Sequence, residues 1–545
     1  MSNTGTTSTI TSGTVSSARA SVLPSAPASS TSSSPTSLKD ILGKQLIIAD
    51  GAMGTQLQAR GLPPGLAPML WNVSHPDTVR AVHTAYLEAG ATLITANTFS
   101  VNALTLKTTD LSVAEVITAG VTLAREALEQ HGTQGCFVAL DVGPLGELLK
   151  PLGQSAFDDA VALFTEQVEA GSAAGADCIL IETMIDTYEL KAAVLAAREA
   201  SSLPVLATVA VNKQGRLLNG ADIACVCALL EGLGVDALGL NCGDGLQETV
   251  PFIEELRALS STPLVFSPNA GLPVMENGTA VYSTSIEEYV TTLRPLAGEY
   301  AAVVGGCCGT TPAHIKALAA ACEGVVPKPA TPKNRRVISS YAASLALDEE
   351  ALRKGRVIEE ACGEKAAGEG TAGEEAAGNE APGGTPASEA ALIVDTRIDA
   401  ATNAELAEAL ACGDYEYAAD EALDAQGEGA RIIGVCAARA GAEEPPERAD
   451  STPADDELPE RADSAVQTSY EEAQALPAMI EAIQALVNVP LLITATTPAA
   501  FERALRVYNG CPLVDLSRCA PEDRDAARTL VARYGAAIKE AGEGQ

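Results

Sequence analysis

Residues 301–306, AAVVGG, form the last of a series of short apolar runs, and the number of those runs decides the fold. Segments with helical spacing, such as PDTVRAVHTAYLEAG, separate the runs. Continuous apolar strands that alternate with helices are typical of parallel sheets covered on both faces. The seven earlier runs are QLIIAD (45–50), TLITAN (92–97), CFVALDV (136–142), CILIET (178–183), PVLATVAV (204–211), ALGLNC (237–242) and PLVFSPN (263–269).

Eight such units within residues 38–326 predict an α/β fold of the (β/α)₈ TIM-barrel type. The alternative is an open, doubly wound sheet. That fold often carries a glycine-rich phosphate-binding turn after its first strand, and the run at 45–50 is not followed by one. The count and the missing turn therefore favour the closed barrel.

The composition restricts the partners and the compartment. The chain has 545 residues and a net charge of -36, so it repels nucleic-acid backbones and anionic membrane surfaces. No apolar run is long enough to cross a bilayer. Its 13 cysteines are odd in number and scattered, which favours a reducing compartment over a disulfide framework. We therefore expect a cytoplasmic protein without nucleic-acid or membrane partners.

The remaining regions differ sharply in composition from the predicted barrel. The last region contains the runs ALIVDT, ARIIGVCA and VPLLITAT, which predict three or four βα units, too few to close a barrel alone. The fold is therefore expected to end in a partial α/β region. The predicted organisation is a disordered Ser/Thr-rich tail (1–37), the barrel (38–326), a low-complexity linker (327–390) and the partial α/β region (391–545) with a disordered insert (442–465).

Three cysteines follow predicted strands whose ends are close around the barrel rim. Cys242 ends the sixth strand, and Cys307 and Cys308 follow the eighth. Reactive residues of such barrels lie at these strand ends. Three thiolates resemble a zinc site with an open fourth position, which would hold a substrate thiol as a nucleophilic thiolate for alkylation. A strained vicinal disulfide and small core residues are the alternatives. The glycines around the pair favour the metal site.

Two carboxylates occupy other strand ends. Asp50 ends the first strand, and Glu182 lies near the end of the fourth, where a carboxylate in an apolar strand is costly without a partner. Asp50 is predicted to accept hydrogen bonds from a substrate ammonium group, with capping of the following helix as the alternative. Glu182 is predicted to have a binding role. The backbone N–H groups of the turn at Gly51 and Ala52 are predicted to bind a substrate carboxylate.

Several motifs in order resemble those of the homocysteine S-methyltransferase family. They are DGAMGTQLQARGL, HTAYLEAGATLITANTFSVN, GPLGELL, LIETMIDTYELKAA, LNGADI, GLNCGDG, SPNAGLP and VVGGCCGTTPAHI. Residues 38–326 are most similar to the homocysteine-binding module of cobalamin-dependent methionine synthases.

The resemblance implies a (β/α)₈ barrel in which Cys242, Cys307 and Cys308 bind a catalytic Zn²⁺ ion that holds the homocysteine thiolate. It also implies that the amino acid is bound by the turn of Asp50, Gly51 and Ala52, by Glu182 and by Asn241.

The last region resembles part of a pterin-binding barrel, but it departs from that pattern at two strand ends. The strand end that reads Asp-Val-Asn in the family is Gly434-Val435-Cys436 here, and the Asp-Ser-Ser end is Thr494-Ala495-Thr496. We therefore predict that the region does not bind folate as the intact module does, and interpret it as a remnant or a docking surface. No Asp-x-His-x-x-Gly cobalamin motif is present, so cobalamin is expected only through a separate partner protein.

The function predicted from the sequence is zinc-dependent methyl transfer to homocysteine, which forms methionine, with a methylcorrinoid protein as the donor. One alternative keeps the reaction but takes the methyl group from S-methylmethionine or S-adenosylmethionine. A second is a non-catalytic docking module for a corrinoid protein. A third keeps the chemistry and changes the acceptor to another small thiol.

Overall fold

The computed structural model describes residues 37–276, 279–331, 333, 335–348, 357–360, 392–439 and 471–539. The predicted tail up to residue 36, much of the predicted linker and the whole predicted insert (442–465) lie outside these residues.

The eight-stranded sheet is a closed parallel barrel, as predicted. Its strand order is β1-β10-β7-β6-β5-β4-β3-β2, and a parallel bridge between Ala49 and Leu93 joins the first strand to the last. Each of the eight predicted runs corresponds to one of these strands, and only β4 extends beyond its run, by one residue. They are β1 (Ile47–Ile48), β2 (Leu93–Thr95), β3 (Phe137–Val142), β4 (Cys178–Met184), β5 (Val205–Val209), β6 (Ala237–Cys242), β7 (Leu264–Pro268) and β10 (Val303–Val304).

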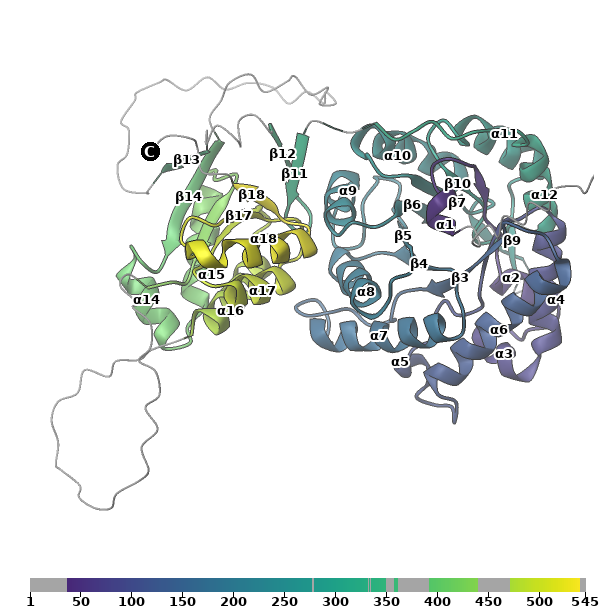
Figure 1. Cartoon of the computed structure of the whole chain (residues 1–545), viewed down its shortest axis with the longest axis horizontal. Coiled ribbons are helices and arrows are strands. Elements are labelled where there is room, and N and C mark those ends of the chain that lie inside the picture. The colour runs from purple at the N-terminus through teal and green to yellow at the C-terminus, as the bar shows by residue number, and fades with distance from the viewer. Residues whose placement is uncertain are drawn as a thin grey trace, which may run out of the picture. The chain divides into compact units, whose positions relative to one another are not determined.

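Helices surround the barrel strands (Figure 1). Helix α6, for example, buries one apolar face; it begins after the N-cap Ser112 and ends at the left-handed Gly132. No helix in the described ranges is both long and apolar enough to cross a membrane. The helices of this region are α1 (Leu38–Ile41), α2 (Gly54–Gln58), η1 (Pro68–Leu70), α3 (Trp71–Ser74), α4 (Pro76–Glu88), α5 (Ala103–Leu106), α6 (Val113–His131), α7 (Phe157–Ala173), α8 (Thr187–Ala200), α9 (Ile223–Gly232), α10 (Leu246–Leu259), α11 (Ile286–Leu296) and α12 (Pro312–Ala321).

His83, on α4, makes the barrel sensitive to acid. The ring is fully buried, and neither ring nitrogen has a hydrogen-bond partner among the described residues. Burial lowers the pKa of His83 from 6.5 to about 4, so the folded chain holds a neutral ring that the unfolded chain protonates below pH 6.5. Stability is therefore lost as the pH falls from 6.5 towards 4.

We expect His83→Phe to reduce the drop in unfolding free energy between pH 7 and pH 5 by about 2 kcal/mol. Urea denaturation at both pH values measures it, with the exposed His75 replaced by Phe as the control. An equal drop in the His83→Phe variant and in the wild type would contradict the argument.

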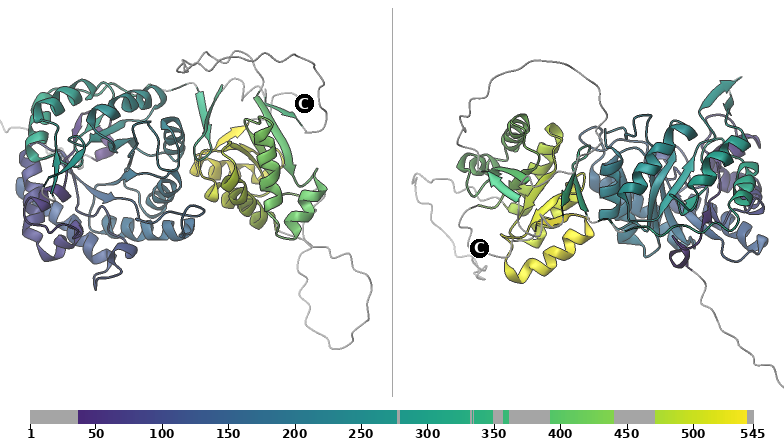
Figure 2. Two further views of the ribbon diagram at one scale, coloured as in Figure 1. Left: turned by 180° about the vertical axis from the view of Figure 1, so that it is seen from behind. Right: turned by 90° about the horizontal axis from the view of Figure 1, so that it is seen from above.

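A second parallel sheet, here called the C-terminal sheet, has the sequential order β13-β14-β15-β16-β17-β18. Its helices lie along one face (Figure 2), as right-handed crossovers between successive strands require. Its elements are β13 (Val357–Glu360), β14 (Leu392–Asp399), α14 (Ala404–Ala411), α15 (Glu416–Gly427), β15 (Ile433–Cys436), α16 (Glu472–Leu486), β16 (Leu491–Thr494), α17 (Pro498–Val507), β17 (Leu513–Asp515), η2 (Pro521–Asp523), α18 (Arg524–Arg533) and β18 (Ala537–Lys539).

A hairpin covers part of the other face of the C-terminal sheet. Its strands, β11 (Arg335–Ser339) and β12 (Ser344–Asp348), lie inside the range predicted as linker, and so does β13. Ile338 of the hairpin packs in one buried cluster with Leu492 and Leu513 of the sheet. The hairpin therefore buries apolar surface that the interior of a closed barrel would otherwise cover.

Candidate metal and substrate site

Three cysteines meet at the carboxyl ends of β6 and β10. The Sγ atoms of Cys242, Cys307 and Cys308 lie within 4.8 Å of one another, as a group that can hold a metal ion. A zinc–sulfur bond of about 2.3 Å in a tetrahedron places ligand sulfurs about 3.8 Å apart, so the spacing suits this ion. All three residues are only partly buried, which leaves the cluster open to the barrel mouth.

Backbone strain is concentrated at this site. Among the described residues other than glycine, only Thr183 (φ 60°) and Cys242 (φ 57°) have positive φ. Such conformations cost about 1–3 kcal/mol and persist where the surroundings enforce them. Gly305 and Gly306 follow β10 and precede Cys307, and close packing requires both glycines. A Cβ atom on Gly305 would lie 2.6 Å from Ala49 Cβ, and one on Gly306 would lie 2.4 Å from Thr310 Oγ1. The chain therefore holds the cysteines in place at an energetic cost.

The thiols of the cluster share a negative charge. Hydrogen bonds from Cys307 and Cys308, with a further one from Asn269, lower the pKa of Cys242 to about 3. The same interactions with Cys242 raise the pKa of Cys307 well above its usual range and that of Cys308 to about 11. A partly buried thiolate beside two further sulfurs is a ligand set that attracts a soft cation.

Asp50 follows β1, and its side chain points towards the neighbouring strand β2. The residue is 3% exposed, and its carboxylate accepts hydrogen bonds from Thr95 N (2.9 Å) and Thr95 Oγ1 (3.1 Å). Burial raises the pKa of Asp50 to about 7. The helix-capping alternative is wrong, because Met53 is the N-cap of α2 and no side chain caps that helix.

Glu182 and Asn241 lie together at the ends of β4 and β6. Asn241 Nδ2 donates to Glu182 Oε2 (3.3 Å) and to Thr183 Oγ1 (2.8 Å), while Asn241 Oδ1 accepts from Thr183 N (2.8 Å). Burial, with the charges of Cys242 and Asp50, raises the pKa of Glu182 to about 8. The amide of Asn241 is thus engaged within the protein, where it holds both Glu182 and the strained Thr183.

The turn that follows Asp50 is tied to the segment after the cysteine pair. Ala52 N donates to Thr310 Oγ1 (3.1 Å), and Tyr86 Oη donates to Ala52 O (2.9 Å). A Cβ atom on Gly51 would lie 2.4 Å from Thr310 Oγ1, so this position requires glycine. A substrate carboxylate would have to compete with Thr310 for the Ala52 N–H, while the turn holds Asp50 beside the cysteines.

Two residues at the site were missed by the sequence argument. Asp141, in β3, is 7% exposed, and its Oδ1 has no hydrogen-bond partner among the described residues. Burial and the charges of Glu182 and Asp50 raise the pKa of Asp141 well above its usual range. The signal was present as one charged residue inside the apolar run CFVALDV.

Tyr282 is the second missed residue and had no comparable signal. It ends β9 (Thr279–Tyr282), which pairs with β8 (Pro273–Glu276) in a hairpin after β7. Its phenol is hydrogen-bonded to Cys308, and burial together with that contact raises its pKa. The hairpin therefore brings an aromatic side chain to the cysteines.

A separate hollow of about 780 Å³ lies at the carboxyl ends of β14 to β17. Cys436 and Thr494, two of the departures from the pterin-binding pattern, line it. Arg518 reaches over the strand ends, pairs with the carboxylate of Asp399 through both terminal nitrogens and contacts Cys436 Sγ (3.2 Å). Asp399 is therefore already neutralised by a protein group.

Comparison with known proteins identifies the barrel. The family model described as homocysteine S-methyltransferase matches residues 47–322. The chain is 37% identical over 304 residues to a methionine synthase of Mycobacterium tuberculosis (strain ATCC 25618 / H37Rv), covering 52% of this chain and 25% of that protein. A methionine synthase of Mycobacterium leprae (strain TN) is 36% identical over 315 residues, with 54% and 26% covered. The chain thus spans about a quarter of the length of these relatives.

Among solved structures, the metallated homocysteine methyltransferase MmuM from Escherichia coli is 29% identical to this chain. The alignment has a TM-score of 0.44 and covers 51% of this chain and 96% of that one.

Proposed function

Since the chain belongs to the homocysteine S-methyltransferase family, we propose that its barrel methylates homocysteine on sulfur and so forms methionine. One observation carries the proposal. The cysteine cluster of Cys242, Cys307 and Cys308 lies at the same barrel mouth as three buried or partly buried carboxyl groups. The sulfurs suit the thiol end of homocysteine, and the carboxylates suit its ammonium end.

The three cysteines would hold a zinc ion and leave its fourth position to the substrate sulfur. When bound, zinc lowers the pKa of the homocysteine thiol, so that the substrate is present as a nucleophilic thiolate at neutral pH. The sulfur then forms a bond to the methyl carbon of the donor, and the electron pair of the broken bond leaves with the carrier. No general base is required from the chain once the thiolate is formed.

The carboxylates would fix the other end of the amino acid. Asp141 has a buried acceptor atom that finds no hydrogen-bond partner within the described ranges, and Glu182 is held by Asn241. A substrate ammonium group would supply the missing donors and would favour the ionised form of these acids. Asp50, Glu182 and Asp141 are therefore proposed to bind the ammonium, which orients the sulfur towards the donor.

The proposed donor is a methylcorrinoid protein, as the resemblance to the module of cobalamin-dependent methionine synthases suggests. We place the reaction in the cytoplasm, which suits the free cysteines that the described part of the chain contains.

A donor panel tests the proposal. Purified, zinc-loaded protein is incubated with homocysteine and either a methylcorrinoid protein, S-methylmethionine or S-adenosylmethionine, and methionine is measured. We expect methionine from the methylcorrinoid protein. Formation only from a sulfonium donor would overturn the donor assignment. No product from any donor, together with no homocysteine binding by calorimetry, would leave the non-catalytic docking module as the function.

A further inference from the structure

Helix α8 connects the proposed substrate site to a distant part of the chain. It begins at Thr187, and only Ile185 and Asp186 separate it from β4, the strand that carries Glu182. Asp186 caps the helix by accepting hydrogen bonds from Tyr188 N (2.7 Å) and Glu189 N (3.1 Å). With so short and so well bonded a connection, a displacement of the first turns of α8 would also displace the end of β4.

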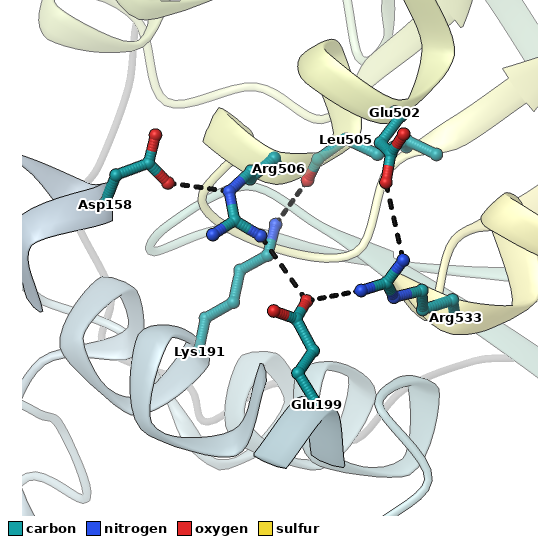
Figure 3. Close-up of polar contacts among 7 residues, drawn as sticks. All are labelled: Asp158, Lys191, Glu199, Glu502, Leu505, Arg506 and Arg533. Atoms are coloured by element: carbon teal, nitrogen blue, oxygen red, sulfur yellow. Dashed lines mark hydrogen bonds and ion pairs between the residues drawn. The ribbon is translucent and has the colours of Figure 1, made fainter. Parts of the chain in front are cut away.

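Residues at the end of α17, and just after it, form hydrogen bonds with the first turns of α8. Asn509 Oδ1 lies 2.8 Å from Thr187 Oγ1, and Lys191 Nζ donates to Leu505 O (2.5 Å) and Tyr508 O (2.6 Å). Figure 3 shows Lys191 reaching from α8 to Leu505. Thr187 and Lys191 are four residues apart and so share one helix face. We call residues 505–509 the clamp segment.

The hydroxyl of Thr187 joins three parts of the chain. Asn219 Nδ2, in the loop after β5, donates to Thr187 Oγ1 (2.7 Å), and the hydroxyl is left to donate to Asn509 Oδ1. Thr187 is 1% exposed. If its hydroxyl lost a hydrogen-bond partner, water would not readily take the place of that partner. The clamp segment thus bonds to a residue that also holds a loop of the barrel.

Lys191 supplies hydrogen-bond donors to two backbone carbonyls of the clamp segment. It is fully buried, and its two hydrogen bonds go to backbone carbonyls at the end of α17. Burial lowers the pKa of Lys191 to about 7, and a neutral amine has two N–H donors for these two acceptors. Both carbonyls would be left without their side-chain partner if α8 moved away.

Ion pairs surround this contact. Arg506 pairs with Asp158 (2.6 Å), and Arg533 pairs with Glu199 (2.7 Å), so acids of α7 and α8 meet arginines of α17 and α18 (Figure 3). Glu502, on α17, pairs with Arg533 (3.4 Å) at the same rim but bonds to no residue of α8. Exposed pairs of this kind contribute little each, so the specific hold on α8 lies with the buried bonds.

We propose that the clamp segment positions the β4–α8 connection, and that the C-terminal sheet thereby serves the substrate site by holding Glu182 in place. This inference rests on the proposed function for its effect on homocysteine. Thr187, Lys191 and Asn509 are positioning residues, since they act through α8. The C-terminal sheet then has a role that requires no ligand of its own.

The experiment uses full-length variants: Thr187→Val and Asn509→Ala break the bond, Thr187→Ser keeps the hydroxyl, and Glu502→Gln is the matched control at the rim. Hydrogen exchange is followed in peptides that span residues 183–191. We expect faster exchange in Thr187→Val and Asn509→Ala, and wild-type exchange in Thr187→Ser and Glu502→Gln. This readout does not depend on activity.

The same variants are compared in methyl transfer. We expect Thr187→Val and Asn509→Ala to raise the KM for homocysteine by about 3- to 10-fold, with zinc content unchanged and kcat within about twofold. Unchanged exchange and unchanged KM in both variants, with an active wild type, would overturn this inference alone. A wild type that neither binds nor methylates homocysteine would overturn the proposed function, and with it the role of the clamp segment in substrate binding.

Discussion

Replacing Cys307 with alanine is expected to remove bound zinc and to lower the rate of methionine formation by about a thousandfold or more. Two sulfurs would remain from a cluster whose three Sγ atoms lie within 4.8 Å, and two ligands do not hold the ion in a catalytic geometry. Loss of several kcal/mol of stabilisation of the substrate thiolate corresponds to a rate change of this size. Metal analysis of the purified protein and single-turnover kinetics measure both effects.

The control for this prediction is Cys322→Ala. Cys322 is a buried cysteine that follows α12 and belongs to the apolar core, so its loss should leave zinc content and turnover near the wild type. Cys308→Ala and Cys242→Ala should behave like Cys307→Ala. Full zinc content with full activity in any one of the three cluster variants would exclude that cysteine from the site.

Glu182→Gln is expected to raise the KM for homocysteine by about 100-fold with zinc retained. The change keeps the shape of the side chain and its contact with Asn241 but removes the charge that would pair with the substrate ammonium. Truncating one member of a buried, hydrogen-bonded charge pair costs about 2–5 kcal/mol, which includes this factor. Asp141→Asn should act in the same direction, because Asp141 Oδ1 is a buried acceptor with no partner in the part of the chain that the structure describes.

The direction in which homocysteine binding changes with pH follows from the raised pKa values of Glu182 and Asp50. Glu182 has a pKa of about 8 and Asp50 of about 7, so both are substantially protonated at pH 7 before the substrate binds. An ammonium favours the ionised acids, so homocysteine binding should release protons and should tighten as the pH rises towards 8.

Calorimetry in buffers of different ionisation enthalpy measures the proton release, and Glu182→Gln should release fewer protons than the wild type. Glu129→Gln, at an exposed position on α6, is the control with wild-type release. Equal release in wild type and Glu182→Gln would remove Glu182 from the ammonium site.

Much of the site could be predicted because parallel strands place their carboxyl ends at one rim. Cys242 and Cys307 are 65 positions apart in the chain, yet Cys242 ends one apolar run and Cys307 follows another, and counting the runs was enough to bring them together. The same rule placed Asp50 and Glu182 at the rim. Asp141 is the penultimate residue of its run, as Glu182 is, so the same rule could have placed it at the rim. Tyr282 could not be placed in this way, because a hairpin, which no strand count predicts, carries it to Cys308.

The C-terminal region was less predictable. The runs ALIVDT, ARIIGVCA and VPLLITAT correspond to β14, β15 and β16, whereas β11, β12 and β13 lie in the range interpreted as linker. These strands are short, and their burial depends on the surface that they cover. Ile338 is buried because the C-terminal sheet offers it Leu492 and Leu513, a partnership with no local signal.

By itself the sequence determined the barrel, the order of its strands, and the cysteines and carboxylates at its rim. These features could be predicted because the spacing of apolar residues and the ends of the strands are local properties that repeat along the chain. The tertiary structure alone decided the positive φ of Thr183 and Cys242, the buried free acceptor of Asp141 and the partners of Lys191. These features depend on contacts such as that of Lys191 with Leu505, 314 residues away, which only packing can bring together.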